Sequence, residues 1–286
     1  MATTNNRLYA PQVASISGVD AGGLMTANIE SGYEQVVESA PDGLQVPVVD
    51  RLAQFVRGQF VTQDWAIAIG LLTGTLSDYT FYERKSGVAE ATGYVLHTLT
   101  NAVVHGVSLS FSQGRFSTAA CRFECKAADE TKTITDMWSQ TDDQAAPTYV
   151  SSARGGHRFI STTHGAVGSE VSINHVTAFN FNIACGLQKA CNDSDVAYTA
   201  VDRLLTKMRA TGSITYADGT VSSGILAARL ATAGRAPLIG TVRQAEAAAN
   251  KVITVNGVVF TGGSASSDVN SQYTGYSSKA WYLLAD

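Results

Sequence analysis

The sequence is poor in charged residues. Asp, Glu, Lys and Arg make up 15% of its 286 residues, and the formal net charge is −4. Average soluble proteins contain about 25% of these residues. Because interface cores are depleted in charge, the low content favours large contacts between subunits. The alternative is a β protein of small residues that has no partner. No Lys/Arg cluster forms an electrostatic footprint for gripping nucleic acid.

Long apolar runs are also missing. The chain has no run of about 18 apolar residues, which excludes a transmembrane helix. The first residues lack the apolar stretch of a signal peptide, so we expect synthesis and folding in the cytoplasm. Cysteine is limited to four residues, with no Cys-x-x-Cys pair: Cys121, Cys125, Cys185 and Cys191. Their spacing fits neither a zinc ribbon nor a disulfide framework, so we expect buried, reduced thiols.

Common catalytic motifs are absent as well. The sequence has no Gly-x-Ser-x-Gly elbow, no Gly-x-Gly-x-x-Gly fingerprint, no P-loop and no His-Glu-x-x-His. The five histidines are scattered without ligand spacing: His97, His105, His157, His164 and His175. The sequence therefore predicts no enzyme, no catalytic residue, no cofactor and no metal site.

What the chain does contain is an internal repeat. Val49-Asp50-Arg51-Leu52, followed by Arg57, recurs 152 residues later as Val201-Asp202-Arg203-Leu204, followed by Arg209. Further downstream, Asn101-Ala102-Val103-Val104 recurs in similar form as Asn256-Gly257-Val258-Val259. Two copies are too few for a solenoid. We expect two halves, residues 1–128 and 166–286, joined by a connecting loop at 129–165. Each half should hold strands, a charged turn, a short helix and a long hairpin.

The dominant hydrophobic period is two. Apolar and polar residues alternate strictly over residues 107–112, which predicts a half-buried strand, and the chain returns through residue 125 as an antiparallel hairpin. Asn256-Gly257 is the preferred pair for a tight hairpin turn. Short helices are expected at 66–73 and 222–232, with a helical turn at 134–137. A second long connection is expected at 32–47. The fold class is therefore mainly β.

The duplicated Asp-Arg pairs are the candidate contact residues. Asp50-Arg51 and Asp202-Arg203 lack a nucleophile or an acid–base partner, which argues against catalysis. They form either an ion pair or turn cap within each half, or a fork between adjacent copies that sets the register of assembly. The candidate assembly residues are Asp50, Arg51, Arg57, Asp202, Arg203 and Arg209.

With these features the chain resembles the tail tube proteins, or major tail proteins, of long-tailed bacteriophages. The resemblance rests on Asn101-Ala102-Val103-Val104 with the hairpin over 107–125, on the segment 209–216 leading into a short helix, and on the final strand ladder. It implies two tandem β-sandwich or β-barrel halves, each with one flanking helix and a long hairpin. Hairpins of neighbouring subunits would then join into a closed barrel.

The resemblance also implies partners. Rings would stack into a hollow tube in the virion tail, assembled in the host cytoplasm. Three duplicated chains would complete a pseudo-sixfold ring, or six chains a plain hexamer. The tape measure protein and the tail terminator or hub proteins would be neighbours, genomic DNA would cross the lumen without sequence-specific binding, and no membrane contact is expected. Ser108, Ser110 and Ser112 are candidates to line the lumen.

Two other functions fit the same sequence. A tail hub, distal tail or terminator ring would use the same fold in a single ring. A carbohydrate-binding β-sandwich would use exposed aromatic residues as a stacking platform: Trp65, Tyr79, Tyr82, Trp138 and Tyr149.

Overall fold

The protein is mainly β in the computed structural model, as the alternating sequence pattern predicts. The structure describes residues 8–16, 19–21, 24–38, 48–63, 65–72, 76–85, 87–89, 91–112, 115, 117–129, 132–147, 158–164, 171–173, 176–191, 200–216, 236–243, 251–266 and 275–283. Within these residues the helices are α1 (Trp65–Gly70) and α2 (Ile134–Met137). The expected helix at 66–73 is confirmed as α1. The one expected at 222–232 lies outside the described residues.

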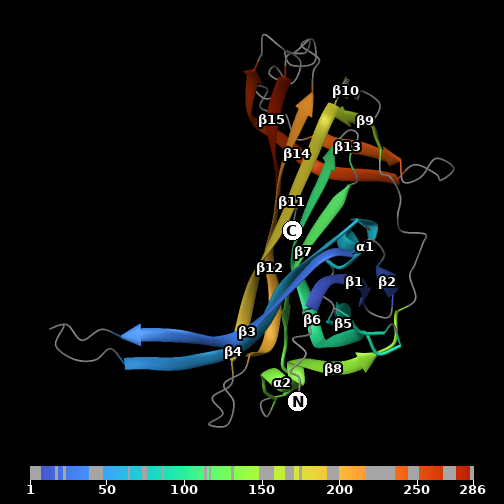
Figure 1. Cartoon of the computed structure of the whole chain (residues 1–286). Coiled ribbons are helices and arrows are strands. Elements are labelled where there is room, and N and C mark those ends of the chain that lie inside the picture. The colour runs from blue at the N-terminus through green and yellow to red at the C-terminus, as the bar shows by residue number, and fades with distance from the viewer. Residues whose placement is uncertain are drawn as a thin grey trace. The chain divides into compact units, whose positions relative to one another are not determined.

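The strands before residue 130 form one connected set. They are β1 (Leu8–Ile16), β2 (Val19–Ala21), β3 (Leu24–Glu38), β4 (Val48–Thr62), β5 (Ser77–Lys85), β6 (Tyr94–Ser112) and β7 (Thr118–Cys125). Pairing follows the order β2-β1-β5-β6-β7-β4-β3. Figure 1 shows β3 and β4 running side by side as an antiparallel pair in blue. The expected hairpin over 107–125 is confirmed, because β7 pairs with β6.

The strands after residue 155 repeat this order. They are β9 (Arg158–His164), β10 (Val171–Ile173), β11 (Val176–Cys191), β12 (Ala200–Tyr216), β13 (Ala236–Arg243), β14 (Lys251–Ser266) and β15 (Gly275–Leu283). Pairing follows β10-β9-β13-β14-β15-β12-β11. Each strand takes the place of the strand numbered eight lower, so one pairing plan occurs twice. The halves at 1–128 and 166–286 stay a prediction.

The segment between the two strand sets contains regular structure. The helical turn expected at 134–137 is confirmed as α2, and β8 (Trp138–Gln144) follows it and pairs with β6. β9 also begins within 129–165. The sequence predicted a connecting loop here and not β8 or β9. β8 forms by pairing with the distant strand β6, and its sequence lacks the alternation of apolar and polar residues that predicts a strand.

The chain forms two compact units. Unit 1 takes its described residues from Met1–His105, Ala120–Ala153 and Gly186–Thr206, and unit 2 from Gly106–Ala119, Arg154–Cys185 and Lys207–Asp286. Each unit therefore collects pieces of both strand sets. The long strands β6, β11 and β12 each contribute residues to both units.

The core of unit 1 is a cluster of aromatic rings. Phe60 lies at 6.1 Å from Tyr79 and 5.9 Å from Phe81, between ring centroids, and Phe81 stacks on Phe123 at 6.2 Å. All four side chains are at most 1% exposed. Burial also raises the pKa of the Tyr79 hydroxyl above its usual value. Such rings bring large apolar area and directional contacts, so they dominate the packing of this unit.

The core of unit 2 comes from alternate residues of β6 and β11. Phe111 packs on Phe179 at 6.0 Å between centroids, and Phe179 stacks on Phe181 at 6.4 Å. Val107 and Leu109 on β6 complete the layer. These are the apolar positions of the alternating pattern, which confirms the predicted half-buried strand.

Three thiols lie in these cores. Cys121, Cys125 and Cys185 are buried and free of disulfides. Burial raises the pKa of Cys121 to about 12 and also raises that of Cys185. The prediction of buried, reduced thiols is confirmed for these three residues; Cys191 lies at the end of β11, where side chains are not described.

Two local predictions were wrong. The charged turns expected at Asp50-Arg51 and Asp202-Arg203 are strand residues, at the third and fourth positions of β4 and β12. Asn256-Gly257 is not a hairpin turn but lies within β14. The register against β13 shifts between Val255 and Val258, which makes this dipeptide a β-bulge. In each case long-range strand pairing overrides the local preference.

The expected connection at 32–47 was also too long. β3 continues to Glu38 and β4 begins at Val48, with Gly32 paired opposite Phe55. Residues 39–47 lie outside the described residues. A long two-stranded ribbon therefore replaces most of the expected loop.

Candidate functional site

Two polar pairs join β6 to β11 in unit 2. The strands are antiparallel, with Ser108 opposite Asn182 and Ser110 opposite Asn180. Ser108 Oγ donates a hydrogen bond of 2.6 Å to Asn182 Oδ1, and Ser110 Oγ donates one of 2.9 Å to Asn180 Oδ1. Cross-strand pairs of this kind stabilise one register over its neighbours. The repeated hydroxyl–amide pairs, here called the Ser–Asn ladder, align β11 on β6.

The Ser–Asn ladder occupies the polar face of the β6–β11 pair. Successive side chains of a strand point to opposite faces. Val107, Leu109 and Phe111 are buried, whereas the three intervening serines are half-buried: Ser108, Ser110 and Ser112. The candidate lumen residues thus share one face. With hydroxyl and amide groups alone, these positions can form hydrogen bonds but carry no charge that would hold an anion.

Unit 1 has a charged pair on the β3–β4 ribbon. Glu30 stands opposite Arg57, whose Nε and Nη2 donate hydrogen bonds of 3.3 and 3.2 Å to the carboxylate. The Arg57 guanidinium also lies 4.3 Å from the centroid of the Phe55 ring. Its hydrogen bonds to Glu30 raise the pKa of Arg57 above its usual value. The two charges neutralise each other at the surface, with side-chain exposures of 46% and 56%.

The strand pairs β3–β4 and β11–β12, here called the two ribbons, each contain a glycine that lies close to an asparagine of the partner strand. A Cβ on Gly58 would collide with the backbone oxygen of Asn28, and one on Gly212 would lie 2.7 Å from that of Asn180. Both sites therefore require glycine for close backbone approach. Asn180 follows Asn28 by 152 residues, the offset of the sequence repeat. These two contacts mark equivalent points on β3 and β11.

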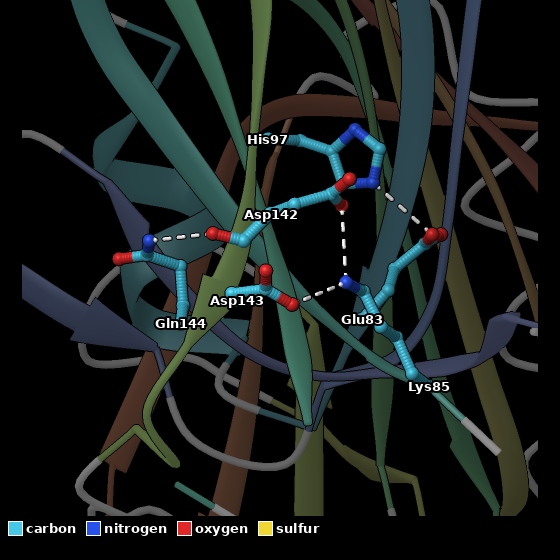
Figure 2. A network of polar contacts seen from close by, with 6 residues as sticks. All are labelled: Glu83, Lys85, His97, Asp142, Asp143 and Gln144. Carbon is cyan, nitrogen blue, oxygen red and sulfur yellow. Dashed lines mark hydrogen bonds and ion pairs between the residues drawn. The ribbon is translucent and has the colours of Figure 1, made fainter. Parts of the chain in front are cut away.

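A second polar cluster lies in unit 1 around His97 on β6 (Figure 2). His97 Nδ1 accepts a hydrogen bond of 3.2 Å from the indole N–H of Trp138, which can only donate. The proton of the neutral ring is then on Nε2, which donates to Glu83 Oε2 at 3.1 Å. Gln140 on β8 lies 3.3 Å from Nδ1. The imidazole is 4% exposed and ties β8 to β5 and β6.

Lys85 completes the cluster. Its ammonium lies 3.0 Å from Asp143 Oδ1 and 3.4 Å from Asp142 Oδ1. Figure 2 draws both contacts as dashed lines. The Lys85 side chain is 9% exposed, whereas both carboxylates are largely in solvent. The hydrogen bond to Asp143 raises the pKa of Lys85. Asp143 adopts a positive φ of 57°, a conformation that Asp tolerates better than most residues.

Both ring nitrogens of His97 take part in the contacts that hold β8 to the sheet. A general base needs a ring nitrogen within reach of a substrate proton. Both nitrogens of His97 are engaged, one by Glu83 and the other by Trp138. Throughout the described residues, no group of three or more His, Cys, Asp and Glu side chains could hold a metal ion. The cluster therefore acts to fix β8 on the sheet.

The structure brings together only some of the predicted site residues. Arg57 pairs with Glu30 rather than with a duplicated aspartate, and Ser108 and Ser110 belong to the Ser–Asn ladder. Arg209 is exposed on β12, opposite Leu283 of β15. The other four assembly candidates lie on strands whose side chains are not described at those positions: Asp50, Arg51, Asp202 and Arg203.

Sequence reasoning missed the partners of these residues. Glu30, Asn180 and Asn182 carry the cross-strand contacts but were not singled out. Asn180 and Asn182 do alternate with apolar residues in the sequence, which is a signal for one polar face. The sequence does not show which strand these asparagines face, because the partner of Asn180 is Ser110, 70 residues away along the chain.

Comparison with known proteins gives no match, either to a family model or to a curated protein sequence. In the part of the chain that the structure describes, no helix has the length and apolar character needed to cross a membrane.

Proposed function

We propose that this protein is a structural subunit of a bacteriophage tail, which assembles into stacked rings and forms the hollow tube that DNA crosses. The observation that carries the proposal is the repeated strand order, β2-β1-β5-β6-β7-β4-β3 and β10-β9-β13-β14-β15-β12-β11. A chain with two copies of one pairing plan supplies two similar segments to a ring. Contacts that repeat by rotation close into such rings.

Exposed sheet edges give a physical reason for assembly. β3 is 15 residues long and pairs with β4 alone among the described strands. A long edge without a partner invites pairing with another chain, and natural proteins normally protect it. Closure of strands into a barrel removes such edges altogether. Ring formation would therefore satisfy backbone groups that one copy leaves at its edge.

The polar faces suit a channel for DNA. The Ser–Asn ladder offers neutral groups, and the charge of Arg57 is balanced by Glu30. Phosphate binding depends on unpaired Lys and Arg, which release counterions on contact. A lumen with neutral groups and paired charges would let DNA pass without holding it. In such a channel, Ser108, Ser110 and Ser112 would line the lumen.

The partners follow from the role. Three chains would form a pseudo-sixfold ring, and rings would stack into the tail of the virion. The tape measure protein would occupy the lumen before ejection, and terminator or hub proteins would cap the tube. A plain hexamer of six chains is the alternative ring.

Electron microscopy of the purified protein at rising concentration tests this function. We expect hollow rings in end-on views and stacks of rings in side views. Monomers at every concentration would overturn the proposal. A single ring that never stacks would instead identify a hub, distal tail or terminator component, which would occur once per virion rather than in many copies.

A further inference from the structure

β11 has a pairing partner that its counterpart β3 lacks. β11 pairs with β12 and also, over residues 178–184, with residues 106–112 of β6. β3 holds the same place in the first strand set, where β4 takes the role of β12. Over residues 26–32, β3 pairs with β4 and with no other described strand. One edge of this segment therefore has no described partner strand.

β14 presents the complementary edge. It is the counterpart of β6, and over residues 259–266 its described partner is β15 alone. The corresponding part of β6 pairs with β7 and, in addition, with β11. Because a strand has two edges, one edge of residues 259–266 lacks a described partner. β3 and β14, which have these edges, are the counterparts of β11 and β6, which pair with each other in unit 2.

Exposed hydrophobic side chains lie on the same two strands. Among the described residues, the large hydrophobic side chains that are exposed are Met25 and Tyr33 on β3 and Val252 on β14, at 47%, 41% and 60%. Single exposed hydrophobic residues are common on protein surfaces. Met25 and Tyr33 flank residues 26–32 of β3, whereas Val252 lies in the part of β14 that pairs with β13.

We propose that β3 of one copy pairs with β14 of a second copy, antiparallel and in the register that β11 adopts on β6. The occupant of each edge is thus this same protein. The contact is heterologous, because two different surfaces meet, and each copy keeps one β3 and one β14 edge for its neighbours. The inference rests on the proposed function only in requiring self-assembly.

The equivalence of β3 and β11 is set by their close-approach glycines. The contacts Asn28–Gly58 and Asn180–Gly212 are the same kind of close approach, and their asparagines lie 152 residues apart whereas their glycines lie 154 apart. Residues of β11 therefore match residues of β3 that are numbered 152 lower. By this rule Asn182 corresponds to Glu30, and both stand on the polar face of their strands.

The equivalence of β6 and β14 is set by matching bulges. The register of β6 against β5 shifts across residues 99–102, between Leu99 and Ala102. The register of β14 against β13 shifts across residues 255–258, between Val255 and Val258. The structural offset is therefore 156 residues, one more than the offset between Asn101 and Asn256 in the sequence repeat. β14 shifts register again, against β15 between Phe260 and Gly262, and the proposed register takes β6 to carry a matching shift there.

The two offsets place serines opposite the exposed acceptors of β3. The pair Asn180–Ser110 transfers to Asn28–Ser266, and the pair Asn182–Ser108 transfers to Glu30–Ser264. Both of these β14 positions are serines, as in the β6 ladder. The sequence offset would instead put Ala265 opposite Asn28 and Gly263 opposite Glu30, where no hydroxyl is present.

Engineered disulfides test this register. The variant N28C/S266C should form disulfides between chains on mild oxidation of the assembled protein, because directly opposite residues bring Cβ atoms to about 4.5–5.5 Å. The matched control is N28C/A265C, in which a one-residue step turns the second thiol to the other face. The unmodified chain, with its native cysteines, is the background control. Non-reducing gel electrophoresis measures the product, and at saturation we expect a covalent ring of three chains.

Mixing the single variants N28C and S266C gives a second readout that does not need the double variant to fold. The expected product is a disulfide dimer that contains one chain of each kind and grows no further. Stronger crosslinking of N28C/A265C, or a disulfide within one chain, would overturn the proposal. Rings in the electron microscope without any interchain disulfide would overturn the proposed edge contact and leave the tube function standing. The absence of both would overturn the tube function as well.

Discussion

Ser108 Oγ donates a hydrogen bond of 2.6 Å to Asn182 Oδ1 across the β6–β11 pair, and the next pair of the ladder repeats the contact two residues away. Ser108 and Asn182 are 74 residues apart in the chain. In this pair of long strands, polar pairs fix the register while the alternate apolar residues form the core.

Removal of this hydrogen bond should destabilise unit 2. For Asn182→Ala we expect a loss of about 1 kcal/mol in the free energy of unfolding, the usual net contribution of one intramolecular hydrogen bond. Ser108→Ala should lose a similar amount, and the double variant should lose less than the sum because the partners share one bond. Urea denaturation measures all three. Additive losses would show that the ladder does not act as a pair.

Alanine at the close-approach glycines should destabilise both ribbons. Gly58→Ala would drive a methyl group into the Asn28 carbonyl and the Phe123 ring, and Gly212→Ala would crowd Asn180. Overpacking of this kind costs about 1–3 kcal/mol. Gly70→Ala is the matched control, since a Cβ there meets nothing within 4 Å. Thermal melts would compare the three, and equal melting temperatures for Gly58→Ala and Gly70→Ala would contradict the packing.

Loss of the exposed carboxylate on β3 should affect assembly more than folding. Glu30→Ala removes a surface ion pair, so the free energy of unfolding should change by at most about 1 kcal/mol. The same residue faces Ser264 in the proposed contact, so ring formation should require a higher protein concentration. Sedimentation velocity measures this threshold. Lys132→Ala, which breaks the exposed pair with Asp136, is the control and should leave the threshold unchanged.

The stability that the contact between Lys85 and Asp143 contributes should be lost at alkaline pH. Folding raises the pKa of Lys85 above its ordinary 10.5, so this stabilisation is full below that value. It is then lost as the pH rises through the higher folded-state pKa. The melting temperature of the wild type should exceed that of Lys85→Met by a constant amount between about pH 7 and 9. The gap should narrow above the ordinary lysine pKa. A gap that stays constant in alkali would exclude the ionised ammonium as its cause.

Local sequence patterns predicted the elements that depend on local chemistry. Alternation over residues 107–112 marks a strand because its period matches the pleat, and the repeated Asp-Arg text falls at the same positions of β4 and β12. The hairpin turn predicted at Asn256-Gly257 was wrong. A dipeptide that favours a turn also fits a β-bulge when its strand pairs with neighbouring strands. The partners of Ser108 and His97 could not be predicted, since cross-strand register between distant segments is set by tertiary packing.

The number of chains in the smallest closed ring distinguishes a pseudo-sixfold ring of duplicated chains from a plain hexamer. Native mass spectrometry of freshly assembled protein would measure it. With a chain mass of 30.1 kDa, three duplicated chains should give a ring of about 90 kDa. A ring of six chains would contradict the role of the duplicated strand plan, and a lone monomer under assembly conditions would contradict ring formation itself.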